Sequence, residues 1–126
     1  MGDVNWIAVL TAWAVAAALG VAMYGKRAMF GGDLLRHAIA ALLLLLVAAM
    51  MGHMFARVGE ATLAAKPWLY PMMSGGLALA FAGPVLFIAY ARRDYPQAEA
   101  WRDYGAWVLT YLAMGAAFWA LGPVAG

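Results

Sequence analysis

Four long runs without aspartate, glutamate, lysine or arginine divide this 126-residue chain, and they constrain its fold more than any other feature. With His37 counted as a boundary, the runs cover residues 4–24, 38–56, 67–91 and 104–126, or 21, 19, 25 and 23 residues. The apolar core of a bilayer is roughly 30 Å thick and takes about 20 helical residues to cross. We therefore predict an all-α integral membrane four-helix bundle, built as two helical hairpins, with spans at about 4–24, 38–56, 67–91 and 104–122.

The composition supports lipid as the solvent of this chain. Hydrophobic residues make up 67% of it and charged residues only 11%, whereas about 25% of a soluble domain is charged. The connections at 25–37, 57–66 and 92–103 are too short to hold a soluble domain. We therefore expect residues 1–126 to form a single transmembrane domain.

The lysines and arginines are distributed unevenly between the connections. Six lie in the first and third connections, and two lie in the second. Because basic residues favour the cytoplasmic side, we predict a multi-pass protein of the bacterial inner membrane with both termini in the periplasm. The six are Lys26, Arg27, Arg36, Arg92, Arg93 and Arg102, and the two are Arg57 and Lys66.

Side chains that carry out catalysis are scarce. The chain has no cysteine, one serine (Ser74) and two histidines (His37 and His53). A nucleophile, a base and an orienting group are therefore hard to assemble, and no acid–base pair is evident. We predict that the protein is not an enzyme, needs no cofactor and does not bind nucleic acid, because its basic residues form no patch.

Small residues at four-residue spacing occur in three of the spans. Such strips let helix backbones approach closely, which drives association where lipid removes the hydrophobic effect between helices. We predict helix packing at these strips, and the spacing leaves open whether the neighbour belongs to this chain or to another protein. The strips consist of Ala12, Ala16 and Gly20, of Ala48, Gly52 and Ala56, and of Gly76 and Ala80.

The third span is interrupted by glycine and proline. Gly83 and Pro84 lie inside it and predict a helix kink, with neighbouring helices satisfying the backbone groups that proline frees. Interrupted helices also mark binding sites in transporters. Those sites usually carry an ionisable residue in the membrane, and these spans have no Asp, Glu, Lys or Arg.

His53 lies near the outer end of the second span beside Met50 and Met54. Imidazole and thioether groups together are typical of a Cu(I) site. The spacing from Ala49 to His53 also resembles that of helices that ligate chlorophyll-type pigments. A histidine at the membrane interface with an ordinary hydrogen bond explains the same residues, so cofactor binding at His53 is the lesser alternative.

Local signals mark several helix ends. Asp33 and Asp103 precede the second and fourth spans and are predicted N-caps. Pro67 fits the first turn of the third helix. Gly25 and Gly122 fall where helices commonly end.

Two aromatic residues with polar groups lie deep in the spans. Trp13 and Tyr111 are each expected to find a hydrogen-bond partner inside the bundle, because buried indole and phenol groups usually do. The other aromatic residues lie nearer the predicted membrane surfaces, as interfacial anchors do.

The first helix opens with Asn5, Trp6, Ile7, Ala8 and Val9, and Tyr24 and then Phe30 and Gly31 follow in the first connection. These residues resemble the bacterial domain of unknown function 1761 family, with Met23 where that family has tryptophan. The segments from Gly75 and Gly76 to Tyr90 and from Tyr111 to Leu121 are also similar. The resemblance implies a small four-span inner-membrane protein and no assigned activity.

These observations favour a non-catalytic accessory or scaffold subunit that self-associates or packs against a partner in a larger membrane complex. The main alternative is a small oligomeric transporter or channel that uses the interrupted third helix. A pigment- or copper-binding subunit is a more distant alternative.

Overall fold

The protein is helical throughout most of the two stretches, residues 3–24 and 34–124, that the computed structural model describes. Two short segments pair in an isolated antiparallel bridge, between Val4 and Val124. The prediction of an all-α fold with four helices of membrane-spanning length is confirmed. The helical segments are α1 (Trp6–Tyr24), α3 (Leu34–Val58), α4 (Glu60–Ala65), α5 (Leu69–Leu77), the π-helical turn η1 (Ala78–Ala82), α6 (Gly83–Arg92) and α7 (Gln97–Leu121).

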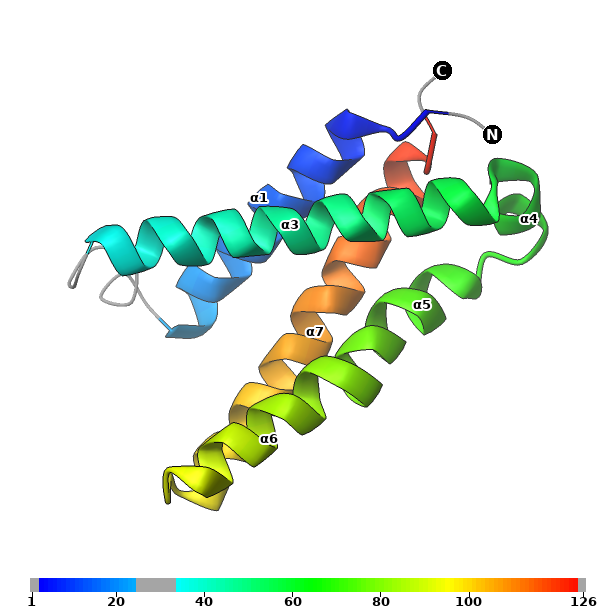
Figure 1. The fold of residues 1–126 in the computed structure, drawn as a ribbon. Helices are drawn as coiled ribbons and strands as arrows, with labels where there is room; N and C mark the ends of the chain where they lie inside the picture. Colours follow the sequence, from blue (N-terminus) through cyan, green and yellow to red (C-terminus); the bar gives the residue numbers. More distant parts are fainter. Residues whose placement is uncertain (1–2, 25–33, 125–126) are drawn as a thin grey trace.

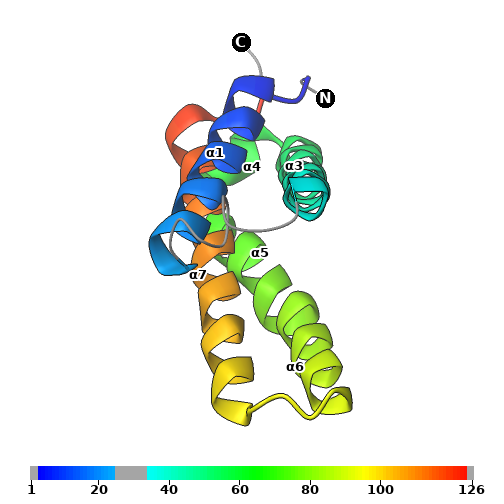
Figure 2. The ribbon, with the colours of Figure 1, turned by 90° about the vertical axis from the view of Figure 1, so that its left-hand side faces the viewer.

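In Figure 1 α3 runs across the view, and α5, η1 and α6 form one continuous helix that runs beside α7. We call the end where α1 begins and α7 ends the termini end. The opposite end, where α6 leads into α7, is the loop end. The two hairpins meet at the termini end, and α3 and α6 spread apart away from it, while α6 and α7 stay together. Figure 2 shows α3 nearly end-on while α7 runs down the view. α7 packs against α1 and against α5–α6, so it joins the two hairpins.

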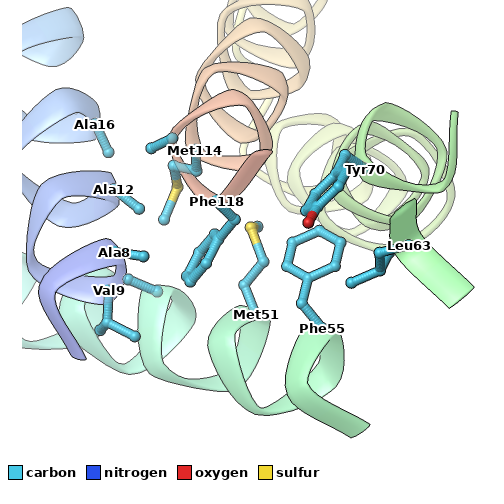
Figure 3. Packing of buried hydrophobic residues seen from close by; sticks show 12 residues of the cluster. Ala8, Val9, Ala12, Ala16, Met51, Phe55, Leu63, Tyr70, Met114 and Phe118 are labelled. Atoms are coloured by element: carbon cyan, nitrogen blue, oxygen red, sulfur yellow. The ribbon is translucent and has the colours of Figure 1, made fainter. Parts of the chain in front are cut away.

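The core lies at the termini end. Phe55 of α3 packs against Tyr70 of α5 and Phe118 of α7, with ring centroids 5.0 and 5.3 Å apart. In Figure 3 the buried side chains of Met51 and Met114 lie beside these rings. Leu63 of α4, a short helix in the predicted loop 57–66, is also buried in this cluster. All four long helices therefore contribute to one packed core near the chain ends.

Asn5 ties the two ends of the chain together. Its Oδ1 accepts a hydrogen bond from the Ala8 backbone N–H at the start of α1. Its Nδ2 donates to the carbonyls of Leu121 and Gly122, at 3.0 and 3.1 Å, where α7 ends. One amide thus satisfies groups at two helix termini, which would otherwise lack partners. Gly122 is the C-cap of α7 and has a φ of 87°, so its predicted role is confirmed.

Two helix boundaries differ from the predicted ones. α7 begins at Gln97, so Asp103 lies inside the helix and its prediction as an N-cap is wrong. Its buried carboxylate accepts a hydrogen bond from the Tyr90 hydroxyl at 2.5 Å and pairs with Arg102. These partners allow the helix to continue past a charged residue. Pro67 lies in the turn before α5, which begins at Leu69, and the predictions for Asp33 and Gly25 fall outside the described residues.

Candidate functional site

An apolar groove of about 1490 Å³ lies between α3 and the continuous helix α5–η1–α6. It follows from the way α3 diverges from α6 toward the loop end (Figure 1). We call it the α3–α6 groove. Its α3 wall includes Leu43, Val47, Met50 and Met54, its opposite wall includes Leu77, Phe81, Val85 and Ala89, and Trp107 and Tyr111 of α7 also line it.

The residues of the two walls are well exposed. Met50 is 64% exposed, Phe81 66% and Val85 69%. Residues on the other faces of the same helices are buried, as at Met51 and Ala78. The groove therefore presents a large apolar surface that no other part of the described chain covers.

The interrupted third span is explained by a contact with Tyr104 of α7. Gly83 N–H donates to the Ala78 carbonyl, five residues back, which is the π-helical pattern. Pro84 has no N–H, so it cannot donate to the Leu79 carbonyl in the same pattern. The Tyr104 hydroxyl donates to that carbonyl instead. A neighbouring helix thus supplies the hydrogen bond that proline removes.

Gly83 provides the space for this contact. A Cβ atom at Gly83 would overlap the Tyr104 ring, and Gly83 itself is buried. A π-helical turn at Ala78–Ala82 directly precedes Gly83 and Pro84 within a continuous helix, and the helix kink predicted at these two residues stays a prediction. Gly83 leaves room for the Tyr104 ring, and Pro84 leaves the Leu79 carbonyl without a backbone donor. Tyr104 therefore both packs on and bonds to the helix that forms one wall of the groove.

Two polar groups of α7 line the groove without a partner. The Trp107 indole packs edge-on against the Tyr111 ring, with centroids 6.1 Å apart. Neither the Tyr111 hydroxyl nor the Trp107 indole N–H makes a hydrogen bond within the described residues. The partner expected for Tyr111 inside the bundle is therefore absent from the described part of the chain. Trp13 does have one, because its indole N–H donates to the Ala41 carbonyl of α3 at 3.0 Å.

His53 is exposed at the termini end of α3. Its Nδ1 donates to the Ala49 carbonyl at 2.8 Å, and its ring lies edge-on to Trp6 with centroids 5.8 Å apart. In the structure the four-residue spacing from Ala49 to His53, which resembles that of pigment-binding helices, corresponds to a hydrogen bond within α3. No cluster of three histidine or carboxylate side chains that could hold a metal ion occurs in residues 3–24 and 34–124. Metal or pigment binding at His53 stays a prediction.

The small-residue strips lie in different environments. Ala12 and Ala16 are buried and point toward Met114 and Phe118 of α7 (Figure 3). Gly52 lies against α1, where an added Cβ would be 2.7 Å from Val9 Cγ2, and its neighbours Ala48 and Ala56 are buried.

Gly20, Gly76 and Ala80 lie outside these contacts. A Cβ at Gly20 or Gly76 would meet open space, and Ala80 is exposed. The face of α5 that packs on α7 instead carries Ser74 and Gly75. The strip of Gly76 and Ala80 is therefore free to face a neighbour outside the described chain.

Sequence reasoning missed two close contacts of α7. Gly115 fits against Ser74, whose hydroxyl donates to the Tyr70 carbonyl at 2.7 Å. Gly75 fits against Leu112, 2.6 Å from where its Cβ would be. Gly115 has no small residue four positions away on α7 (Tyr111, Trp119), so spacing did not indicate it.

Comparison with known proteins adds no relative: no protein family, curated protein or solved structure matches this chain. The resemblance to the domain of unknown function 1761 family stays a prediction.

Proposed function

We propose that this protein is a non-catalytic accessory subunit of a membrane complex, and that the α3–α6 groove receives a transmembrane helix of its partner. The observation that carries this proposal is the groove itself, with about 1490 Å³ of apolar space between two exposed helix walls. Because lipid chains are as apolar as these walls, a partner is selected by close packing and hydrogen bonds rather than by hydrophobicity. A preformed groove provides the close packing.

The distribution of charge supports a position in the bacterial inner membrane with the loop end in the cytoplasm. Arg36, Arg92, Arg93 and Arg102 belong to helices or connections at the loop end, and Lys26 and Arg27 follow α1 in sequence. Arg57 and Lys66 are the only basic residues of the second connection. The excess at the loop end is the pattern of cytoplasmic loops, and it leaves both termini in the periplasm.

The transporter alternative rested on the interrupted third helix. In the structure the Leu79 carbonyl beside Pro84 accepts a hydrogen bond from Tyr104 within the bundle. In transporters, the freed backbone groups of a broken helix bind the substrate or ion. The contact with Tyr104 therefore favours the accessory subunit over the transporter.

Site-specific photocrosslinking in native membranes tests the proposal. A photoreactive phenylalanine derivative replaces Leu46 on the α3 wall or Val85 on the α6 wall, and Ala18 on the outer face of α1 serves as the control position. We expect one protein adduct of constant mass from Leu46 and Val85 and none from Ala18. Labelling of lipid alone at the groove positions would contradict the proposal. Substrate flux in liposomes that contain only this protein would favour the transporter.

A further inference from the structure

The size of the α3–α6 groove indicates the kind of occupant. Its volume of about 1490 Å³ exceeds the roughly 300–1,000 Å³ of a pocket for a small molecule. The α6 wall runs from Leu77 to Ala89, a little over three helical turns. An open apolar groove of this length suits an elongated helix rather than a compact small molecule.

The unpartnered donors of α7 add a chemical requirement. Tyr111 lies near the middle of α7 and Trp107 lies one turn closer to the loop end. Both line the groove, and neither has a hydrogen-bond acceptor within the described residues. A polar group that faces hydrocarbon without a partner is unfavourable. An occupant with an acceptor at this depth is therefore favoured over a purely aliphatic one.

The charges at the loop end of the groove add a second requirement. Arg36 lies one helical turn before the groove residue Ala40, and Arg93 lies four residues after the groove residue Ala89, with Arg92 beside it. All three arginines are exposed. Because the walls diverge toward the loop end, each wall continues into its own cationic groups, Arg36 on α3 and Arg92 and Arg93 on α6. The arginines of either wall are complementary to acidic side chains at the end of an inserted helix that lies along it.

The same charges argue against a second copy of this chain as the occupant. A copy that lies parallel in the membrane would bring its own loop end to these arginines. Its α1 is followed by Lys26 and Arg27, and its α3 and α6 carry Arg36, Arg92 and Arg93 there. Three of its four long helices would therefore place like charges together, and the fourth, α7, has one face already packed against α1, α5 and α6.

Resting on the function proposed above, we propose that the groove binds a transmembrane helix of a different protein, which carries a hydrogen-bond acceptor at mid-membrane and acidic residues at the loop end. The acceptor bonds to the Tyr111 hydroxyl or the Trp107 indole N–H. The acidic flank faces Arg92 and Arg93 where the helix follows the α6 wall, or Arg36 where it follows the α3 wall.

Synthetic transmembrane peptides test both requirements. The first peptide has about 20 leucine and alanine residues, one central asparagine and three glutamates at one end. A second has leucine in place of the asparagine, and a third has lysines in place of the glutamates. Binding is measured by energy transfer in phosphatidylcholine vesicles to a dye on a single cysteine introduced at Gln97, since the chain has no cysteine of its own.

For the unsubstituted protein we expect the asparagine peptide to bind about 3- to 5-fold more tightly than the leucine peptide, the size of one hydrogen bond in a membrane. In the double variant Tyr111→Phe with Trp107→Phe, the asparagine and leucine peptides should bind equally tightly. Arg36→Gln with Arg92→Gln and Arg93→Gln should remove the preference for glutamate over lysine. Ala89→Trp should weaken the binding of every peptide, and Ala18→Trp, the matched substitution on α1, should not.

Equal binding of the asparagine and leucine peptides would overturn the inference, and so would a ratio that survives the double substitution at Tyr111 and Trp107. A groove crosslink to a second copy of this chain would overturn the assignment to a different protein. Unchanged helical circular dichroism shows that each variant is folded. The crosslinking of Leu46 and Val85 does not depend on these peptides, so the inference can fail while the proposed function stands.

Discussion

The two halves of α3 show what decides burial in this protein. Toward the termini end, the helix buries Ala48, Met51, Gly52, Phe55 and Ala56. Toward the loop end, Leu35, Leu42 and Leu46 are 65%, 65% and 59% exposed. The exposed half is at least as hydrophobic as the buried one, so hydrophobicity does not separate them. What separates the two halves is contact with α1, α4 and α7, because lipid accepts apolar side chains that no helix covers.

The largest effect is expected where two helices approach most closely. Gly115→Leu at the termini end would collide with Ser74 and with the Tyr70 carbonyl, and overpacking of this kind costs about 3 kcal/mol in the free energy of unfolding. Gly105→Leu is the matched control on the same helix, because a Cβ there meets open space. Denaturation in mixed micelles, followed by circular dichroism, measures both. Similar stabilities would mean that the termini end is no more tightly packed than the rest.

A smaller difference is expected between two phenylalanines. Phe118 is fully buried in the core, and Phe81 is 66% exposed in the groove wall. Phe118→Ala leaves a cavity but loses little transfer free energy in lipid, so it should lower the free energy of unfolding by about 2–3 kcal/mol, less than the roughly 3–5 kcal/mol of a soluble core. Phe81→Ala should change it by less than about 0.5 kcal/mol. The same unfolding measurement applies. A loss at Phe81 as large as that at Phe118 would show that the groove is filled within the isolated protein.

The smallest effect concerns the hydrogen bond that supports the groove wall. Tyr104→Phe removes the donor to the Leu79 carbonyl and should cost about 0.6–1 kcal/mol, the usual value of such a bond in a membrane. In a Pro84→Ala background the backbone N–H at residue 84 can take over as donor, so the same substitution should cost almost nothing. A double-mutant cycle measures the difference. Equal costs in both backgrounds would show that the Tyr104 hydrogen bond does not compensate for the backbone N–H that Pro84 lacks.

The number of helices was predictable from sequence because lipid excludes charge. The few charged residues therefore mark the ends of the apolar runs, and four helices of membrane length follow. The exact ends were less predictable. Asp103 lies inside α7 because Tyr90 and Arg102 satisfy its carboxylate, and Tyr90 comes from another helix.

The groove and the packing faces were not predictable for a different reason. In a span that is apolar on every side, no polar face reveals which side meets a neighbour. The spacing of Ala12 and Ala16 follows a real contact, but Gly76 and Ala80 have the same spacing and lie outside the bundle contacts. The groove depends on the direction in which α3 leaves the core, which the spans alone do not encode.

The clamp at Asn5 has a consequence for synthesis in the cell. The amide of Asn5 binds carbonyls 116 and 117 residues later in the chain, and α1 packs against α7. At about 5–20 residues per second, translation takes roughly 6–23 s to pass from one to the other. During this interval the first helix is in the membrane without its final neighbour. The packing around α1 is therefore completed only when α7 is made, and a chain that stops before α7 keeps the contact of α1 with α3 but lacks its contact with α7.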